Sequence, residues 1–213
     1  MTLPLRSFFF VTCLCLYPVA VLEESVYLNI DNISVAVGPG TSPGTFNNTF
    51  GSGHTIDKVI DAPSSDAEEI HSQTTHIWFT ADQVGGGLEL EFDLGIAYDI
   101  STLHFWNYTE ESFDVDNVDF TFFGPSGQQV GTLSVQPDLG TSPGITSQDL
   151  PLAAPLNVRR VTAFLTGSNR QVDFQNIGFT AVVSQIPEPT TTGILFVGGA
   201  IASAVVGRVR RSH

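Results

Sequence analysis

Short segments in which apolar and polar residues alternate dominate the middle of the chain. From Leu88 to Leu94 every second residue is apolar, and three acidic residues stand between them. A period of two places the apolar side chains on one face of a β-strand and the acidic ones on the other. Strand signals recur along the chain and predict further strands at residues 100–106, 118–123, 129–135, 158–165 and 177–183.

No segment of similar length has the 3.6-residue apolar period of an amphipathic helix. Turn residues separate the predicted strands, and the Gly-Pro-Ser-Gly segment at 124–127 joins two of them. The Thr-Ser-Pro-Gly segments at 41–44 and 141–144 are interpreted as two similar turns. The pattern therefore predicts an all-β fold, an antiparallel β-sandwich that occupies residues 25–185.

The first 24 residues have the character of a signal peptide. A basic start that ends at Arg6 precedes an apolar run over residues 7–21, and the chain then becomes acidic. The alternative is a buried first strand or core helix. Both cysteines, Cys13 and Cys15, lie in this run, so a mature chain without it has no thiol for disulfides or thiolate metal sites.

The last residues, 186–213, combine three features in a fixed order. A Pro-Glu-Pro motif at Pro187, Glu188 and Pro189 precedes an apolar stretch at 193–207, predicted to be a transmembrane helix of marginal length. An arginine cluster then ends the chain and would hold the tail on the cytoplasmic side: Arg208, Arg210 and Arg211.

This tail resembles the PEP-CTERM sorting signal of Gram-negative bacteria. The resemblance implies export, recognition by an exosortase-type processing enzyme, and delivery to the cell surface or extracellular matrix. It also implies a link to exopolysaccharide production and biofilm formation. The alternative is a simple membrane anchor.

The order of motifs within the sandwich is similar to that of the galactose-binding-like superfamily, which includes the discoidin or coagulation-factor type C domains. The similarity spans about residues 55–183. It rests on Ile56 to Asp61, Trp78, Leu90 to Gly95 and the strand that ends in Trp106-Asn107-Tyr108. The resemblance implies a jelly roll that binds glycans through loops at one end.

The same resemblance implies a structural calcium ion near an Asp-Gly loop. Asp61 matches the aspartate, but Ala62 replaces the glycine, and Asn176 stands where a glutamate often precedes the final strand. Asp57 and Asp66 add further oxygen ligands of the kind that calcium prefers. Asp61 is therefore the candidate metal ligand, although the two departures weigh against the ion.

Aromatic residues near a strand end are the candidates for ligand contact. Trp106 and Tyr108 can stack on sugar rings, and Asn107 can supply an amide partner. The alternative for Trp106 is a place in the core, which is the preferred interpretation for Trp78. For Tyr108 both interpretations stay open.

Charge and residue spacing exclude several other functions. The chain has 22 Asp and Glu against eight Lys and Arg, so a polyphosphate partner would be repelled and nucleic-acid binding is not expected. His54, His71 and His76 match no metal-ligand spacing and are interpreted as solvated loop residues. Asp114 and Asp116 resemble the paired carboxylates of glycoside hydrolases, but alternation along an extended chain would turn both to one wet face.

The sequence thus predicts an exported surface or matrix protein, not an enzyme, whose sandwich binds carbohydrate and specifically exopolysaccharide. The alternative is a structural or adhesive surface protein without a discrete glycan site, and an enzyme ranks third.

Overall fold

The computed structural model describes residues 24–46, 56–70, 77–153 and 157–184. Within these ranges the chain forms β-strands and one short 3₁₀ helix, and no α-helix. The elements are β1 (Val26–Leu28), β2 (Ser34–Val37), β3 (Gly44–Phe46), η2 (Ile56–Ile60), β4 (Glu69–Ile70), β5 (Ile77–Ala81), β6 (Leu88–Asn107), β7 (Asn117–Phe123), β8 (Gln129–Val135), β9 (Gly144–Ile145), β10 (Gln148–Pro151), β11 (Asn157–Thr166) and β12 (Gln171–Val183).

Both predicted targeting segments fall outside the described residues, apart from residue 24. The same holds for the sorting-motif residues and for the predicted helix at 193–207. In the part of the chain that the structure describes, no helix is long and apolar enough to cross a membrane.

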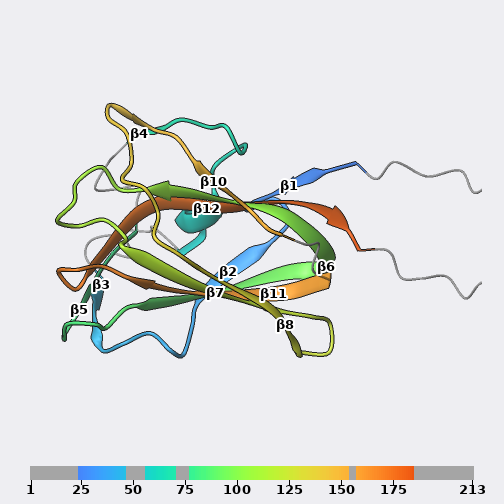
Figure 1. Cartoon of the computed structure of the whole chain (residues 1–213), viewed down its shortest axis with the longest axis horizontal. Helices are drawn as coiled ribbons and strands as arrows, with labels where there is room; N and C mark the ends of the chain where they lie inside the picture. Colours follow the sequence, from blue (N-terminus) through green and yellow to red (C-terminus); the bar gives the residue numbers. More distant parts are fainter. Residues whose placement is uncertain (1–23, 47–55, 71–76, 154–156, 185–213) are drawn as a thin grey trace, which may run out of the picture.

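The strands pair antiparallel and form the two layers of a sandwich (Figure 1). One layer has the order β2, the first half of β6, β11, β7 and β8. The other has β3, β5, β12 and the second half of β6, with β1 added to β12 and β10 added to β6. The short strands β4 and β9 pair with each other as a separate two-stranded sheet.

Strand β6 passes from one layer into the other. Its partner β11 changes register between Val158 and Arg160, opposite residues 93–98, so the chain bulges there. Gly95 lies in this bulge with φ of +75°, a conformation that side-chain-bearing residues rarely adopt. The sequence predicted separate strands at 88–94 and 100–106; the structure corrects this to one strand, because the bulge bends the ladder without ending it.

The other predicted strands are confirmed. Residues 118–123, 129–135 and 158–165 fall within β7, β8 and β11. The segment 177–183 is the second half of β12, which begins six residues earlier at Gln171.

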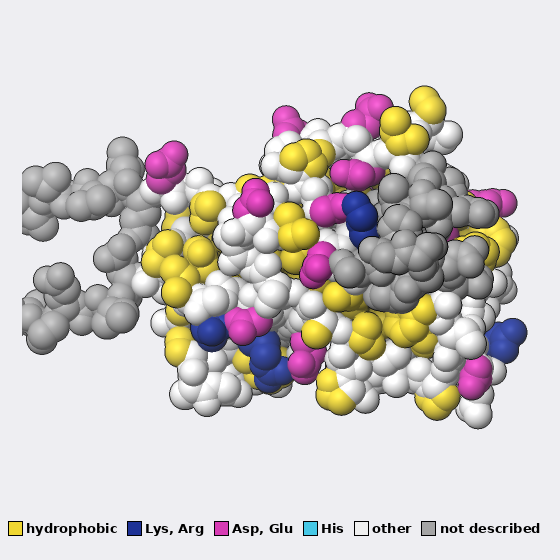
Figure 2. All heavy atoms as spheres, turned by 180° about the vertical axis from the view of Figure 1, so that it is seen from behind, with side chains coloured by type: hydrophobic (Ala, Val, Ile, Leu, Met, Phe, Trp, Pro, Cys, Tyr) yellow, Lys and Arg dark blue, Asp and Glu magenta, His cyan; other side chains and the backbone are white. Residues whose placement is uncertain are grey.

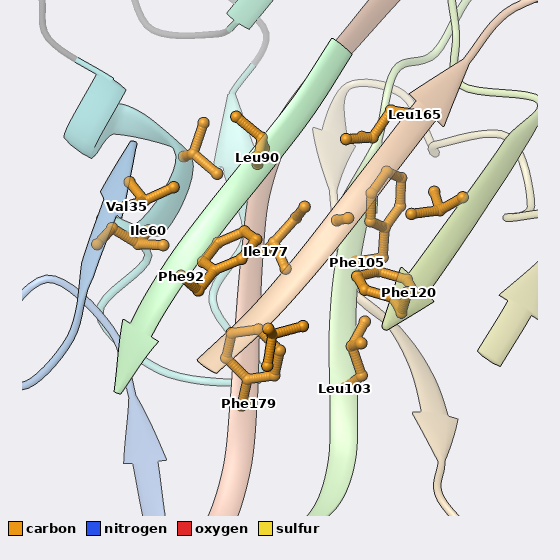
Figure 3. Packing of buried hydrophobic residues seen from close by; sticks show 14 of the residues in the cluster. Val35, Ile60, Leu90, Phe92, Leu103, Phe105, Phe120, Leu165, Ile177 and Phe179 are labelled. Atoms are coloured by element: carbon orange, nitrogen blue, oxygen red, sulfur yellow. The ribbon is translucent and has the colours of Figure 1, made fainter. Parts of the chain in front are cut away.

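The core lies between the two layers, where the apolar faces of the alternating strands meet (Figure 3). Phe92 of β6 and Phe179 of β12 contact each other edge to face, with 5.4 Å between ring centroids. Phe105 of β6 stacks on Phe174 of β12 at 5.7 Å. Such burial removes apolar surface from water at about 25 cal/mol per Å² and is the main stabilising contribution to the sandwich.

Candidate functional site

Loops gather at the end of the sandwich that lies away from the start of β1 and the end of β12 (Figure 1). Backbone hydrogen bonds connect them. The N–H of Gly140 donates to the carbonyl of Tyr108 at 2.7 Å, and the N–H of Asp173 donates to that of Phe113 at 3.0 Å. The loop between β6 and β7 therefore contacts both the segment that follows β8 and the start of β12.

Trp106 lies near the end of β6 and is fully buried. Its ring packs with Ala62 and Ile145 in a second, smaller core, and its Nε1–H donates to the carbonyl of Ala67 at 2.9 Å. An indole with no exposed face cannot stack on a sugar ring. The structure therefore corrects the predicted ligand role of Trp106 and gives it the core position that was the alternative.

Asn107 is 2% exposed, and its amide is engaged by the protein itself. Its Nδ2 donates to the carbonyls of Val115 and Asp138, both at 3.1 Å. Its Oδ1 accepts from the N–H groups of Tyr108 at 2.9 Å and Val115 at 3.0 Å. Asn107 thus ties the loop after β6 to the segment after β8, and it positions the site instead of offering a free amide to a ligand.

Tyr108 is 9% exposed and belongs to an aromatic trio with Phe113 and Trp78. Ring centroids are 6.3 Å apart between Tyr108 and Phe113, and 6.0 Å apart between Phe113 and Trp78, both edge to face. Burial raises the pKa of the Tyr108 phenol, with smaller contributions from Asp173 and Glu110. Tyr108 therefore supports the loop from beneath and presents little ring surface to a ligand. Trp78 is half-buried, so the preference for a core position holds only in part.

Two buried carboxyl groups lie close to this trio. Burial raises the pKa of Asp173 to about 8, so this side chain is mostly protonated at neutral pH. Burial, together with Asp116 and Glu111, raises the pKa of Asp114 to about 6. Asp114 is 6% exposed and lies in a turn, which corrects the expectation that it shares a wet face with Asp116.

The concave feature beside these groups is a pocket of about 310 Å³, here called the β6–β10 pocket. Its walls come from Phe105 and Asn107 of β6 and from residues 138–141 and 146–148. Most of the side chains that project from the last two segments carry hydroxyl, amide or carboxylate groups. The sequence prediction located Asn107 at this site but missed the other lining residues. The sequence signal that could have pointed to these residues was the predicted turn at 141–144, which adjoins both lining segments.

A second hollow, of about 340 Å³, lies between residues 42–43 and the turn at 82–86. Its walls contain two glycines, Gly85 and Gly86, and only a few side chains that can bond to a ligand. The β6–β10 pocket has a denser set of polar groups, and β6 and β10 hold two of its walls. It is therefore the better candidate site.

Solved structures resemble this chain in fold although their sequences differ. The F5/8 type C domain of a Bacteroides fragilis protein covers 75% of the chain and 98% of its own length, with a TM-score of 0.53 and 8% identity. The fold is galactose-binding-like. The family 32 carbohydrate-binding module of C. perfringens NanJ, in complex with galactose, covers 74% of the chain and 99% of its own, with a TM-score of 0.48 and 10% identity. The lectin domain of lectinolysin, complexed with Lewis B antigen, covers 76% and 94%, with a TM-score of 0.43 and 10% identity. The chain matches no protein-family model and no curated protein.

The calcium site implied by the galactose-binding-like resemblance does not fit the residues present. The Oδ1 of Asn176 accepts the N–H of Ala62 at 3.0 Å, and the carbonyl of Ala62 accepts from Nδ2 of Asn29 at 3.1 Å. The carboxylate of Asp61 pairs with the Lys58 ammonium at 2.7 Å. No group of three acidic, histidine or cysteine side chains within the described ranges is arranged to hold a metal.

Asp66, another acidic residue of the predicted ligand set, also forms a local hydrogen bond. It accepts a hydrogen bond from the Ser64 hydroxyl at 2.7 Å, which lowers the pKa of its carboxyl. At this position, therefore, hydrogen bonds and an ion pair connect the groups that a calcium ion would otherwise have joined.

We expect the melting temperature to be the same in excess EDTA and in millimolar CaCl₂, because a neutral amide and a paired carboxylate hold this loop. Asn176→Ala should lower the free energy of unfolding by about 1–3 kcal/mol, since it leaves the buried N–H of Ala62 without its acceptor. Differential scanning calorimetry measures both effects. A melting temperature that falls on chelation would contradict this account.

Proposed function

We propose that the chain is an exported, non-enzymatic protein that binds carbohydrate, specifically exopolysaccharide, in the β6–β10 pocket. The observation that carries the proposal is the pocket itself. It is preformed, it lies at the loop end of the sandwich, and hydroxyl, amide and carboxylate groups gather in its walls. Sites for small ligands combine a concave surface with a few fixed polar groups in this way.

The internal hydrogen bonds of the pocket hold its polar groups in place. Gln148 and Asp138 are joined twice: the N–H of Asp138 donates to Oε1 at 2.8 Å, and Nε2 donates to the carboxylate at 3.0 Å. The Thr141 hydroxyl donates to the carbonyl of Gly144 at 2.6 Å, which leaves its oxygen lone pairs as acceptors. Leu139 is 42% exposed and offers an apolar contact for the C–H face of a sugar. Sugar hydroxyls both donate and accept, so such mixed walls suit them.

The structures with this fold also support a binding function. The NanJ module is described in complex with galactose, and the lectinolysin lectin domain in complex with Lewis B antigen. Glycoside hydrolysis usually needs two carboxyl groups that flank the bound sugar. The pocket wall includes one acidic side chain, that of Asp138, which is compatible with binding.

Export and sorting are proposed on the sequence features alone. Residues 1–24 would direct export, and the tail at 186–213 would anchor the chain in the membrane until an exosortase-type enzyme processes it. The protein would then reside at the cell surface or in the extracellular matrix, where exopolysaccharide is the available glycan. A structural or adhesive surface protein without a glycan site remains the second candidate.

Titration of the purified full-length chain with galactose, N-acetylgalactosamine and soluble exopolysaccharide tests the proposal by calorimetry. We expect saturable binding, and we expect Thr146→Val and Gln148→Ala each to weaken it by about three- to tenfold, since one hydrogen bond contributes about 0.5–1.5 kcal/mol. Thr132→Val is the matched control, because Thr132 is an exposed threonine of β8, in the other layer.

Each outcome has a definite meaning. Equal losses in Thr146→Val and Thr132→Val would place the sugar elsewhere on the molecule. No binding of any glycan by a chain shown to be folded would overturn the carbohydrate function and leave the structural surface protein as the better explanation.

A further inference from the structure

Every basic side chain in the described part of the chain has a partner within the protein. The four are far outnumbered by acidic residues. Lys58 pairs with Asp61 at 2.7 Å, Arg159 pairs with Asp93, Arg160 pairs with Glu91 at 3.2 Å, and Arg170 donates to the carbonyl of Asp82 at 3.0 Å. Figure 2 shows this on one face, where the few basic side chains lie beside acidic ones.

None of these four cations lines the β6–β10 pocket. The one histidine among the described residues, His104, is 3% exposed, and its Nδ1 lies 2.7 Å from the Asp149 carboxylate. It therefore has no face to offer a ligand. Within the described ranges, the pocket and its surroundings contain no cation that can meet an anionic sugar.

Acidic side chains, in contrast, lie in the pocket wall and on the loop tied to it. Asp138 lies in the wall, whereas Asp149, the neighbour of Gln148 in β10, pairs with His104. The loop that Asn107 ties to residue 138 adds Glu110 and Glu111, both exposed. A carboxylate or sulfate group on a bound sugar would meet like charges here, without the bidentate arginine contacts that usually hold such groups.

From this arrangement, we infer that the pocket selects glycans that carry no acidic groups and rejects uronate-containing or sulfated polymers. The inference rests on the proposed function and names the substrate class of the same site. Neutral sugars bring no charge to the pocket, so the surrounding carboxylates do not oppose them.

Oligomers of galacturonic acid provide a matched pair of probes, because full methyl esterification removes the charge and keeps the backbone. We expect the de-esterified oligomer to bind the full-length chain at least about tenfold more weakly than the esterified one at about 0.01 M salt. The gap should shrink towards about 1 M salt, because the Debye length falls from about 30 Å to about 3 Å. A neutral galactan is titrated in parallel.

A charge-removing variant adds a second measurement. Asp138→Asn should narrow the ratio between the two affinities about two- to fivefold, since it removes the carboxylate in the pocket wall. Asp119→Asn is the control, because Asp119 is an exposed acid on β7 and does not line the pocket; its ratio should equal that of the natural chain.

The outcomes separate selectivity from binding. If the de-esterified oligomer binds as tightly as the esterified one, or more tightly, the inference is overturned while the carbohydrate function stands. If neither the esterified oligomer nor the galactan binds, the proposed function fails and the inference fails with it.

Discussion

Trp106→Ala is expected to lower the free energy of unfolding by about 3–5 kcal/mol, the usual range for deletion of a large buried aromatic side chain. The indole is fully buried against Ala62 and Ile145, and its N–H is bonded to the carbonyl of Ala67. The substitution removes both the packing and the hydrogen bond that join the smaller core to β6. Urea denaturation followed by far-ultraviolet circular dichroism measures the loss.

Two further variants show whether this loss has the stated cause. Trp106→Phe keeps most of the ring volume and removes the N–H donor, so its cost should be smaller, about 1–2 kcal/mol. Val84→Ala, at a side chain that is 82% exposed, should change stability by no more than about 0.5 kcal/mol. If Trp106→Ala kept full stability and lost only sugar binding, the core role of the Trp106 ring would be wrong and the ring would contact the ligand.

Asp173→Asn is expected to change the pH dependence of stability more than any other single substitution of a charged residue. The folded-state pKa of Asp173 is about 8 and the ordinary value is 3.8. Between these values the unfolded chain has lost the proton while the folded chain keeps it. The contribution of this carboxyl to stability is therefore complete at low pH and is lost as pH rises between about 4 and about 8, by up to about 1.4 kcal/mol for each pH unit.

Asparagine cannot ionise, so the variant should not show this fall. The difference in the free energy of unfolding between Asp173→Asn and the natural chain should grow in favour of the variant as pH rises. Asp119→Asn, at an exposed position, should run parallel to the natural chain. Parallel profiles for Asp173→Asn as well would mean that the buried carboxyl titrates normally.

The strands that the sequence predicted are segments of six residues or more. Residues 88–94 are the clearest example, because apolar and acidic residues alternate there without a break. The strands that it missed, such as β1 and β3 with three residues each, are too short to show a period. Their positions depend on pairing with β12 and β5, which are far away in sequence.

The candidate site was predictable only in part. The segment Trp106-Asn107-Tyr108 does lie at the loop end, but its side chains turn inward, because β6 is covered on both faces at this point. Sequence alternation identifies one buried face and cannot show that segments 61–67 and 144–147 cover the other. The pocket-lining residues after β8 show no apolar alternation in the sequence. Hydrogen bonds to Gln148 and to Asn107, which is distant in sequence, fix their position instead.

The passage of β6 through both layers also has a consequence for how the molecule loses its structure. Twenty consecutive residues of one strand pair with β2 and β11 on one side of the bulge and with β10 and β12 on the other. Neither layer can separate from the other without breaking the ladder of this shared strand. The sandwich should therefore melt in a single cooperative step. A substitution that destabilises one layer should lower the free energy of unfolding of the whole domain.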